Sequence, residues 1–332
     1  MPISFRSLRK KLFALTACAT VVCLTASANS SAQQFPVQPV RIVAATPPGG
    51  AADINARRLA DRLSRVWKQP VVVQNLSGGA GNVAAVAIAE ATPNGYSMLF
   101  VAHPVLAVNP MLYERLPFNA ERDFTPVILL SKMPHVLLTS MSLSATTVPE
   151  LVALAKARPG SLNFASGGAG TSIHLAGELL MDTAGIELRH VPYRGGAPAV
   201  TALMSGEVQL LFDATATAIG NLRSGRLRGM AIASPTRSPV LPDIPTFEQG
   251  GLRGFESVIA HGILVPAKTP PAMVATLNRA INEILNDPEY QKQMAEFGAE
   301  LIGGPATKFG AFLAAEKTKW AALIRKRGIK SN

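Results

Sequence analysis

Three glycine-rich turns are the parts of this chain whose residue types and spacing are best suited to chemistry. They read Pro47-Pro48-Gly49-Gly50, Ser77-Gly78-Gly79-Ala80-Gly81 and Ser166-Gly167-Gly168-Ala169-Gly170-Thr171-Ser172. Each follows an apolar, β-branched run and precedes a segment of helical periodicity, so each is predicted to open a helix. The first N–H groups of a helix lack partners within it, and the helix dipole is positive there, so such turns attract anions. The turns therefore predict a pocket for a small carboxylate, built mainly from backbone.

Three kinds of side chain near these turns have alternative roles. Thr171 and Ser172 carry hydroxyls that can bond a carboxylate or cap the helix that follows. Asp53 can stabilise the first helical turn and pair with Arg57 at i+4, or it can bind a ligand amine or an ordered water. We favour the first of these two roles. Arg194 can grip a second carboxylate bidentately or lie solvated in a turn. These alternatives stay open at the level of sequence.

The elements that must position these residues alternate along the chain. Continuous apolar strands separated by helices indicate an α/β fold with mostly parallel sheets covered by helices on both faces. The predicted strands are Val40–Ala45, Val71–Asn75, Met98–Ala102, Val136–Ser140, Leu162–Ser166, Leu188–Tyr193, Val208–Asp213 and Gly229–Ala233. The predicted helices between them are Asp53–Val66, Val83–Glu90, Val148–Arg158, Ser172–Ala184, Ala197–Met204 and Ala216–Arg223.

The C-terminal third changes to long amphipathic helices, predicted at Pro270–Leu285 and Thr307–Ile324, whose apolar faces indicate packing. The basic residues after the second helix are interpreted as a solvated tail that complements the helix dipole. Proline-bearing stretches near Phe124–Pro126 and Leu241–Pro245 are interpreted as crossings between two domains. A first domain interrupted by a second predicts a hinge, with a cleft that faces the carboxyl ends of the strands.

The N-terminus indicates export. Four basic residues precede an apolar stretch from Leu12 to Ala26, which is too short to span a bilayer, and small residues follow it. Residues 1–32 are predicted to be a signal peptide cleaved after Ala32, with Ala28 as the second choice. The less favoured alternative is a lipoprotein with lipid attached to Cys18, because the apolar stretch before that cysteine would be very short.

Processing changes the composition in two ways. Both cysteines, Cys18 and Cys23, are lost, which excludes disulfides, thiol nucleophiles and cysteine metal sites. Removing four basic residues and no acidic ones lowers the formal net charge from +11 to +7. The chain has no run of five Lys or Arg and no nucleic-acid motif, so small anions are the favoured partners and nucleic acid is not expected. The five histidines show no metal-binding spacing, and neither a metal nor a cofactor is expected.

An ordered series of short motifs carries a resemblance to a known family. The series comprises Val40-Arg41-Ile42-Val43, Pro48-Gly49-Gly50-Ala51-Ala52-Asp53, Ala56-Arg57, Val72-Val73-Gln74-Asn75, Gly78-Gly79-Ala80-Gly81, Pro93-Asn94-Gly95-Tyr96, Asp123-Phe124-Thr125-Pro126-Val127, His174-Leu175-Ala176-Gly177-Glu178, His190-Val191-Pro192-Tyr193-Arg194-Gly195 and Leu241-Pro242-Asp243-Ile244-Pro245-Thr246. In these motifs the chain resembles the Bug-type solute receptors of tripartite tricarboxylate transporters. The resemblance covers essentially all of the chain that follows the signal peptide.

The resemblance implies a two-domain periplasmic-binding-protein fold of the Venus-flytrap type. Domain 1 would comprise residues 36–130 and 257–332, and domain 2 residues 131–256. The protein would be a monomer in the periplasm that delivers a small carboxylate to the permease subunits of a tripartite transporter. The ligand-binding residues that the resemblance implies are Pro48, Gly49, Gly50, Ala51, Asp53, Ala80, Gly81, Gly170, Thr171, Ser172, His174, Tyr193, Arg194, Gly195 and Asp213. One departure concerns the pocket wall, since the chain has Ala44-Ala45-Thr46 where the family often has Val-Pro-Phe.

Two other functions use parts of the same pattern. Gly79-Ala80-Gly81-Asn82-Val83-Ala84 fits the dinucleotide fingerprint, but no acidic residue occurs between Glu90 and Glu114, where that fingerprint expects one. The chain also has no G-x-S-x-G nucleophile motif, so we do not expect an enzyme. A receptor that signals to a membrane sensor would have the same fold, and the sequence does not separate sensing from transport. Backbone amides recognise any carboxylate, so the sequence does not identify the acid.

Overall fold

The computed structural model describes residues 35–330, and residues 38–330 belong to one compact unit. The predicted signal peptide, its cleavage site and both cysteines lie outside the described residues. Within the described residues, no helix is long and apolar enough to cross a membrane.

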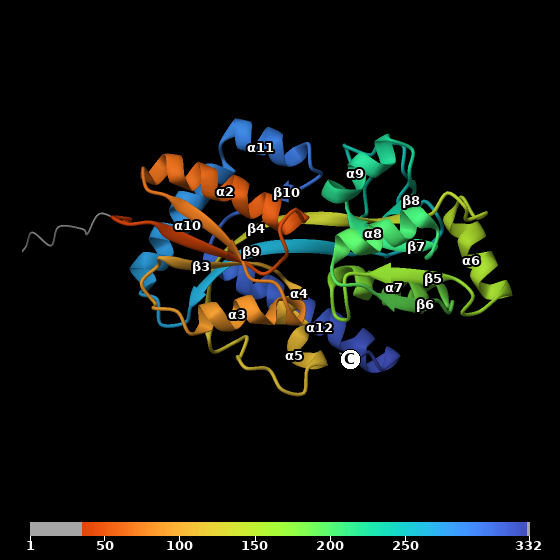
Figure 1. Ribbon diagram of the computed structural model, residues 1–332, viewed down its shortest axis with the longest axis horizontal. Helices are drawn as coiled ribbons and strands as arrows, with labels where there is room; N and C mark the ends of the chain where they lie inside the picture. Colours follow the sequence, from red (N-terminus) through yellow and green to blue (C-terminus); the bar gives the residue numbers. More distant parts are fainter. Residues whose placement is uncertain (1–34, 331–332) are drawn as a thin grey trace, which may run out of the picture. The chain divides into compact units, whose positions relative to one another are not determined.

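The first strand group is built from parallel strands that alternate with helices, as predicted (Figure 1). Strand β1 pairs in parallel with β2 on one side and β3 on the other. The strands are apolar and β-branched, and β1 and β3 are almost completely buried, which fits a sheet covered on both faces. The elements are β1 (Val40–Ala44), α2 (Ala51–Trp67), β2 (Val71–Asn75), α3 (Asn82–Ala89) and β3 (Ser97–Ala102).

The second strand group repeats this pattern later in the chain. Strand β5 pairs in parallel with β6 and β7, and helices connect the strands. The elements are α6 (Val148–Ala157), β5 (Asn163–Ser166), α7 (Ser172–Ala184), β6 (Arg189–Pro192), α8 (Gly196–Ser205), β7 (Leu210–Ala214) and α9 (Thr215–Arg223). All six helices predicted in the body of the chain are present, with ends that differ by a few residues.

Two long antiparallel strands join the two groups. Strand β4 (Phe124–Thr139) pairs with β9 (Val258–Pro266) over most of its length, and the two run side by side in Figure 1. The sheet has the order β2-β1-β3-β9-β4-β7-β5-β6, and the strands β8 (Arg228–Ile232) and β10 (Glu300–Leu301) also pair with β4. The chain thus passes from the first strand group to the second along β4 and returns along β9.

Four elements of this region differ from the sequence analysis. The stretch Phe124–Pro126, interpreted as a domain crossing, is the beginning of β4, which was predicted only from Val136. Strand β9 was not predicted, because His261 and Gly262 interrupt its apolar run. Two short helices after β3 were also missed, since each spans only one turn: α4 (Pro104–Ala107) and α5 (Asn109–Leu112).

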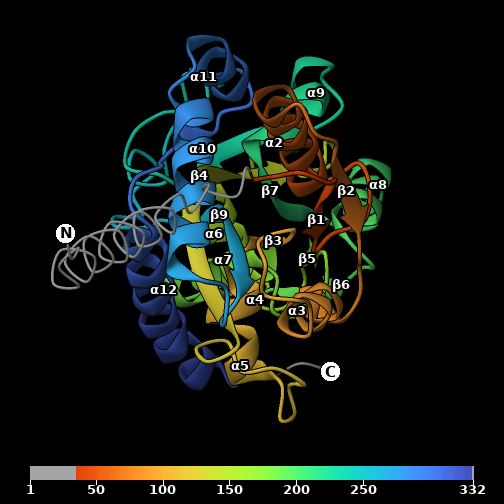
Figure 2. The same ribbon diagram turned by 90° about the vertical axis from the view of Figure 1, so that its left-hand side faces the viewer.

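The C-terminal helices pack on the long strands. Helices α10 (Pro271–Leu285) and α12 (Ala306–Arg327) both contact β4 and lie beside it in Figure 2. The predicted apolar face of α12 is confirmed, with Phe309, Trp320, Leu323 and Ile324 buried. Helix α11 (Pro288–Ala295) lies between them in the chain and was not predicted, because most of its residues are polar.

The apolar cores follow the two strand groups. Two clusters draw only on residues between 136 and 255, whereas a third draws on residues 43–129 and 260–309. A fourth cluster joins α4, α5 and α12 to Leu175 of α7. The division into domains at residues 130/131 and 256/257 remains a prediction.

The contact between β9 and α12 yields a test of this packing. A Cβ atom at Gly262 would lie 2.3 Å from the ring of Phe309, which is fully buried. We therefore expect Gly262→Ala to lower the free energy of unfolding by about 1–3 kcal/mol, because the ring has no room to move. Chemical denaturation would measure the change.

The matched control is Gly220→Ala, in the exposed part of α9, where a Cβ would meet nothing within 4 Å. This variant should be neutral or slightly more stable, since alanine favours helix. An unchanged stability of Gly262→Ala would contradict the close packing of β9 on α12.

Candidate functional site

Each of the three glycine turns opens a helix at the carboxyl end of a parallel strand, as predicted. The first lies between β1 and α2, the second between β2 and α3, and the third between β5 and α7. The residues at the N-caps of these helices are Gly50, Gly81 and Thr171. In open α/β sheets, ligands bind at the carboxyl ends of the strands, where helix N-termini present their free amides.

Asp53 holds the first turn to the end of β2. Its carboxylate accepts the Gly49 N–H at 2.9 Å and the side-chain amide of Asn75 at 2.7 Å. It also pairs with Arg57 at 3.0 Å, so the predicted i+4 pair is present. Burial opposes ionisation, but these hydrogen bonds outweigh it and lower the pKa of Asp53. The charge of Asp53 is thus balanced within the first turn, where Pro48 and Gly49 are exposed and Gly50 is half-buried.

The second turn adopts a left-handed backbone. Gly78, Gly79, Ala80 and Gly81 all have positive φ, with Ala80 at 52°. This conformation is costly for a residue with a side chain, and Ala80 is held in it by its surroundings. Its carbonyl accepts the side-chain amide of Asn109 at 3.1 Å.

Asn109 of α5 joins the second turn to the third. Its amide also donates to Oδ1 of Asn82 at 2.6 Å, and its own Oδ1 is buried with no hydrogen-bond partner among the described residues. A Cβ atom at Gly170 would lie 3.6 Å from this oxygen and 2.6 Å from Cδ1 of Leu112. Turns that are 90 residues apart in the sequence therefore meet at one short helix.

The third turn is closed by its own polar groups. The hydroxyl of Thr171 donates to the Gly168 carbonyl at 2.8 Å and accepts the N–H of His174, so Thr171 caps α7. The N–H of Gly170 donates to Nδ1 of His174 at 3.1 Å. Ser172 is buried, and its hydroxyl lies 3.2 Å from Nε2 of His135 on β4. In this arrangement the side chains of Thr171, Ser172 and His174 bond to protein groups.

The turn after β6 lies against the third turn. A Cβ atom at Gly167 would lie 3.2 Å from the carbonyl carbon of Gly195, so the two backbones are in close contact. The hydroxyl of Tyr193 donates to Glu207 at 2.7 Å, and Arg194 is exposed. Gly195 is the N-cap of α8.

Asp213 lies at the carboxyl end of β7, which pairs with β5. Its Oδ1 accepts the N–H of Ala214 at 2.8 Å and the hydroxyl of Thr217 at 2.6 Å. Its Oδ2 is buried without a hydrogen-bond partner among the described residues. The predicted site residues thus occupy the carboxyl ends of β1, β2, β5, β6 and β7.

Sequence reasoning missed three residues that organise this region. Asn109 and Asn75 fix turns to one another, and His135 bonds Ser172 on one side and Ser257 on the other. Asn75 belongs to a quoted motif, but its contact with Asp53 arises only from the pairing of β2 with β1. No local signal marks Asn109 or His135, because their partners are far away in the sequence.

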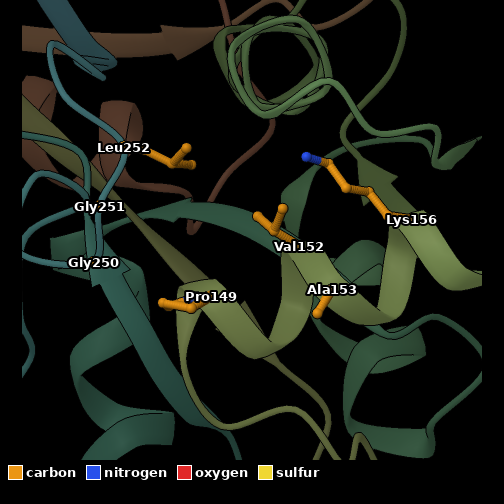
Figure 3. Close-up of a pocket in the computed structure, with 7 residues that line it drawn as sticks. All are labelled: Pro149, Val152, Ala153, Lys156, Gly250, Gly251 and Leu252. Carbon is orange, nitrogen blue, oxygen red and sulfur yellow. The ribbon is translucent and has the colours of Figure 1, made fainter.

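A separate surface depression of about 430 Å³ lies between α6 and the loop before β9 (Figure 3). Figure 3 shows its mainly apolar lining, with Lys156 as the charged residue. The lining residues are Pro149, Val152, Ala153, Lys156, Gly250, Gly251 and Leu252. None of the predicted ligand residues is among them. Across residues 35–330, no group of three or more His, Cys, Asp or Glu side chains is arranged to hold a metal ion.

Three solved structures are similar to this fold. An R. palustris protein with adipate is 31% identical, with a TM-score of 0.86, and the match covers 90% of this chain and all of that one. The periplasmic binding protein BugD is 30% identical with a TM-score of 0.83, over 90% of this chain and 100% of BugD. MatC from Rhodopseudomonas palustris with bound malate is 28% identical with a TM-score of 0.81, over 87% of this chain and 100% of MatC.

A sequence model of one family covers most of the chain. Residues 55–329 match the tripartite tricarboxylate transporter family receptor, and the similar structures are periplasmic binding proteins of the same type. The predicted α/β binding-protein fold is therefore confirmed. The members of this family are solute receptors and not enzymes, which confirms the prediction that the chain is no enzyme. The chain belongs to the tripartite tricarboxylate transporter receptor family, the Bug-type solute receptors of the periplasm.

Proposed function

We propose that this protein binds a small dicarboxylate between its two strand groups and delivers it to a tripartite membrane permease. The observation that carries the proposal is the convergence of the second and third glycine turns on α5, with the first turn tied to the end of β2. Helix N-termini supply amides for a carboxylate without a formal charge on the protein. The adipate and malate held by two similar structures support the dicarboxylate class.

The proposed contacts come from both strand groups. The backbone of residues 48–51 and 80–81 would bind from the first group, and Asp53 would fix the first of these segments. The backbone of residues 170–172 would bind from the second group, bordered by His174 and residues 193–195, while the hydroxyls of Thr171 and Ser172 keep their protein partners. The domains would close on the ligand by a hinge at β4 and β9, where the chain crosses between the strand groups.

Export and delivery complete the proposal. The basic N-terminus and the apolar stretch after it support cleavage of a signal peptide near Ala32 and release into the periplasm. The family description supports a permease as the partner, in preference to a membrane sensor. We propose that the receptor acts as a monomer.

Asp213 places a restriction on the ligand. Burial raises the pKa of Asp213 to about 6, although Thr217 and the Ala214 N–H stabilise the charged form. A fully ionised carboxylate at Asp213 would repel an anionic ligand. Because its pKa is raised, Asp213 takes up a proton more readily, and the protonated carboxyl does not repel the ligand. Its Oδ2, which has no hydrogen-bond partner in the part of the chain that the structure describes, is suited to a ligand hydroxyl, a ligand amine or a bridging water.

Titration calorimetry against mono-, di- and tricarboxylates tests the proposed function. The protein is first freed of copurified ligand by unfolding and refolding. We expect dicarboxylates to bind with a 1:1 ratio and at least about tenfold more tightly than monocarboxylates, since a second charged group adds charge-assisted hydrogen bonds. Absence of binding across the whole panel would refute the carboxylate proposal, and turnover of a bound compound would refute the receptor assignment.

Arg194 offers a test of how the second carboxylate is held. We expect Arg194→Met to weaken dicarboxylate binding about tenfold and to leave the weaker monocarboxylate binding nearly unchanged. The matched control is Arg189→Met, which removes another exposed arginine from β6. Equal effects of both variants on dicarboxylates would indicate a loss of general positive charge and would exclude Arg194 as a specific contact.

The raised pKa of Asp213 makes stability depend on pH. An acid whose folded pKa is raised stabilises the protein fully below the unfolded pKa of 3.8, and this stability is lost as the pH rises through about 6. Between about pH 4 and about pH 7 we expect the wild type to lose roughly 2 kcal/mol of unfolding free energy relative to Asp213→Asn.

Denaturant unfolding at both pH values would measure this difference. The control is the exposed Asp243→Asn, which should leave the pH dependence as in the wild type. If Asp213→Asn kept the pH profile of the wild type, the carboxyl of Asp213 would titrate normally.

A further inference from the structure

A chain of polar contacts leads from the third glycine turn to the C-terminal helix. The Gly170 N–H donates to Nδ1 of His174 at 3.1 Å, and Nε2 of the same ring lies 3.4 Å from Oε1 of Glu178. The other carboxylate oxygen of Glu178 accepts Nε–H of Arg327 at 3.1 Å. His174 and Glu178 lie on adjacent turns of α7, whereas Arg327 is the last residue of α12.

The hydrogen bond from the Gly170 N–H fixes the tautomer of His174. A backbone N–H can only donate, so Nδ1 must be the accepting nitrogen of the ring. In the neutral ring the proton then resides on Nε2, where Glu178 is the acceptor. Burial alone would raise the pKa of Glu178, but the hydrogen bonds from His174 and Arg327 outweigh it and lower this pKa. The carboxylate therefore remains charged and orients the ring.

Stacking holds the same ring from the side. The His174 ring lies 4.0 Å from the ring of His190 and is nearly parallel to it, with an interplanar angle of 19°. Nε2 of His190 in turn lies 2.6 Å from the hydroxyl of Ser166, at the start of the third turn. The two stacked histidines thus bond to both ends of the turn, and His174 is the one that continues to α12.

Arg327 is the only guanidinium that the described residues bring to Glu178. The Arg327 side chain is 20% exposed and that of Glu178 is 11% exposed. Water therefore solvates the negative charge of the Glu178 carboxylate poorly. Arg327 also pairs with Glu187 at 3.0 Å, beyond the end of α7. Loss of the guanidinium would leave Glu178 as a nearly buried charge without a counter-ion, which favours rearrangement of its neighbours. The sequence analysis interpreted this basic tail as solvated; that interpretation is wrong for Arg327, whereas the side chain of Lys326 is 67% exposed.

We propose that Arg327 is a positioning residue for the third turn. By holding Glu178 it keeps His174 in the tautomer that accepts the Gly170 N–H, and so fixes the turn backbone in a conformation that is ready to bind a carboxylate. The inference rests on the proposed function, because it assigns ligand binding to this turn. It couples the far end of the C-terminal helix to ligand affinity, although Arg327 itself does not contact the ligand.

Lys326 provides a matched control on the same two helices. Its ammonium lies 2.6 Å from Oδ1 of Asp182, one turn beyond Glu178 on α7. Asp182 makes no contact with His174 among the interactions of the described residues. A variant of Lys326 therefore removes an ion pair between α12 and α7 and leaves the contacts of His174 in place.

The test combines adipate affinity by calorimetry with the ¹⁵N NMR signals of His174 in the ligand-free protein. For Arg327→Met we expect roughly tenfold weaker adipate binding, the size of effect that outer hydrogen-bond partners exert on a binding group. We also expect loss of the NMR signature of an accepting Nδ1 and a protonated Nε2. Lys326→Met should retain this signature and bind adipate within about twofold of the wild type.

A double variant separates positioning from the damage that an unpaired charge causes. Arg327→Met with Glu178→Gln has no buried carboxylate without a counter-ion, since Glu187 is 60% exposed, and it should fold. It should still bind adipate roughly tenfold more weakly. Wild-type affinity in the double variant would overturn the inference, as would equal losses in Arg327→Met and Lys326→Met. If the wild type does not bind adipate, the ligand class is wrong. The NMR signature then decides the positioning role by itself, and an unchanged signature in Arg327→Met would refute it.

Discussion

The antiparallel pairing of β4 with β9 is the interaction on which the rest of the structure depends. The chain leaves the first strand group along one of these strands and returns along the other, so both groups are anchored to the same ladder. Parallel strands bring helix N-termini to one edge of a sheet, but two separate groups make one site only if a common element aligns them. The ladder does this, since it brings the third turn of the second group against α5 of the first.

Some of the polar groups buried along and beside this ladder pair with one another, whereas both ring nitrogens of His261 on β9 lack a hydrogen-bond partner among the described residues. His135 on β4 lies between the hydroxyls of Ser257 and Ser172, and burial lowers its pKa to about 3, so the ring is neutral. Glu316 of α12 accepts the indole N–H of Trp320 at 2.7 Å and lies 3.2 Å from His103. Such partners are hard to replace, because each buried polar atom that loses one costs about 1–3 kcal/mol. The network therefore favours a single arrangement of strands and helices at the crossing.

Local patterns in the sequence were sufficient for much of this structure. The glycine turns and the apolar runs before them predicted the strand ends and the helix starts, because both depend on residues close together in the chain. The alignment of the turns could not be predicted, since Asn109, Leu112 and Gly170 meet only through the sheet order. Strand β9 was missed for a related reason, as Gly262 is required by Phe309 of a distant helix. The roles of Lys326 and Arg327 likewise depend on acids more than 130 residues away.

The crowding around the third turn has a consequence for how receptors of this kind diversify. A Cβ atom at Gly170 would lie 2.6 Å from Leu112 and one at Gly167 would lie 3.2 Å from the Gly195 backbone, so the shape of this turn tolerates little change. The groups that would hold a charge belong to the main chain, which every sequence possesses. Under the proposed function, recognition of a carboxylate is thus inherited with the fold, while the choice among acids is left to exposed residues such as Arg194. A duplicated gene could acquire a new ligand through a few surface substitutions, with little loss of stability.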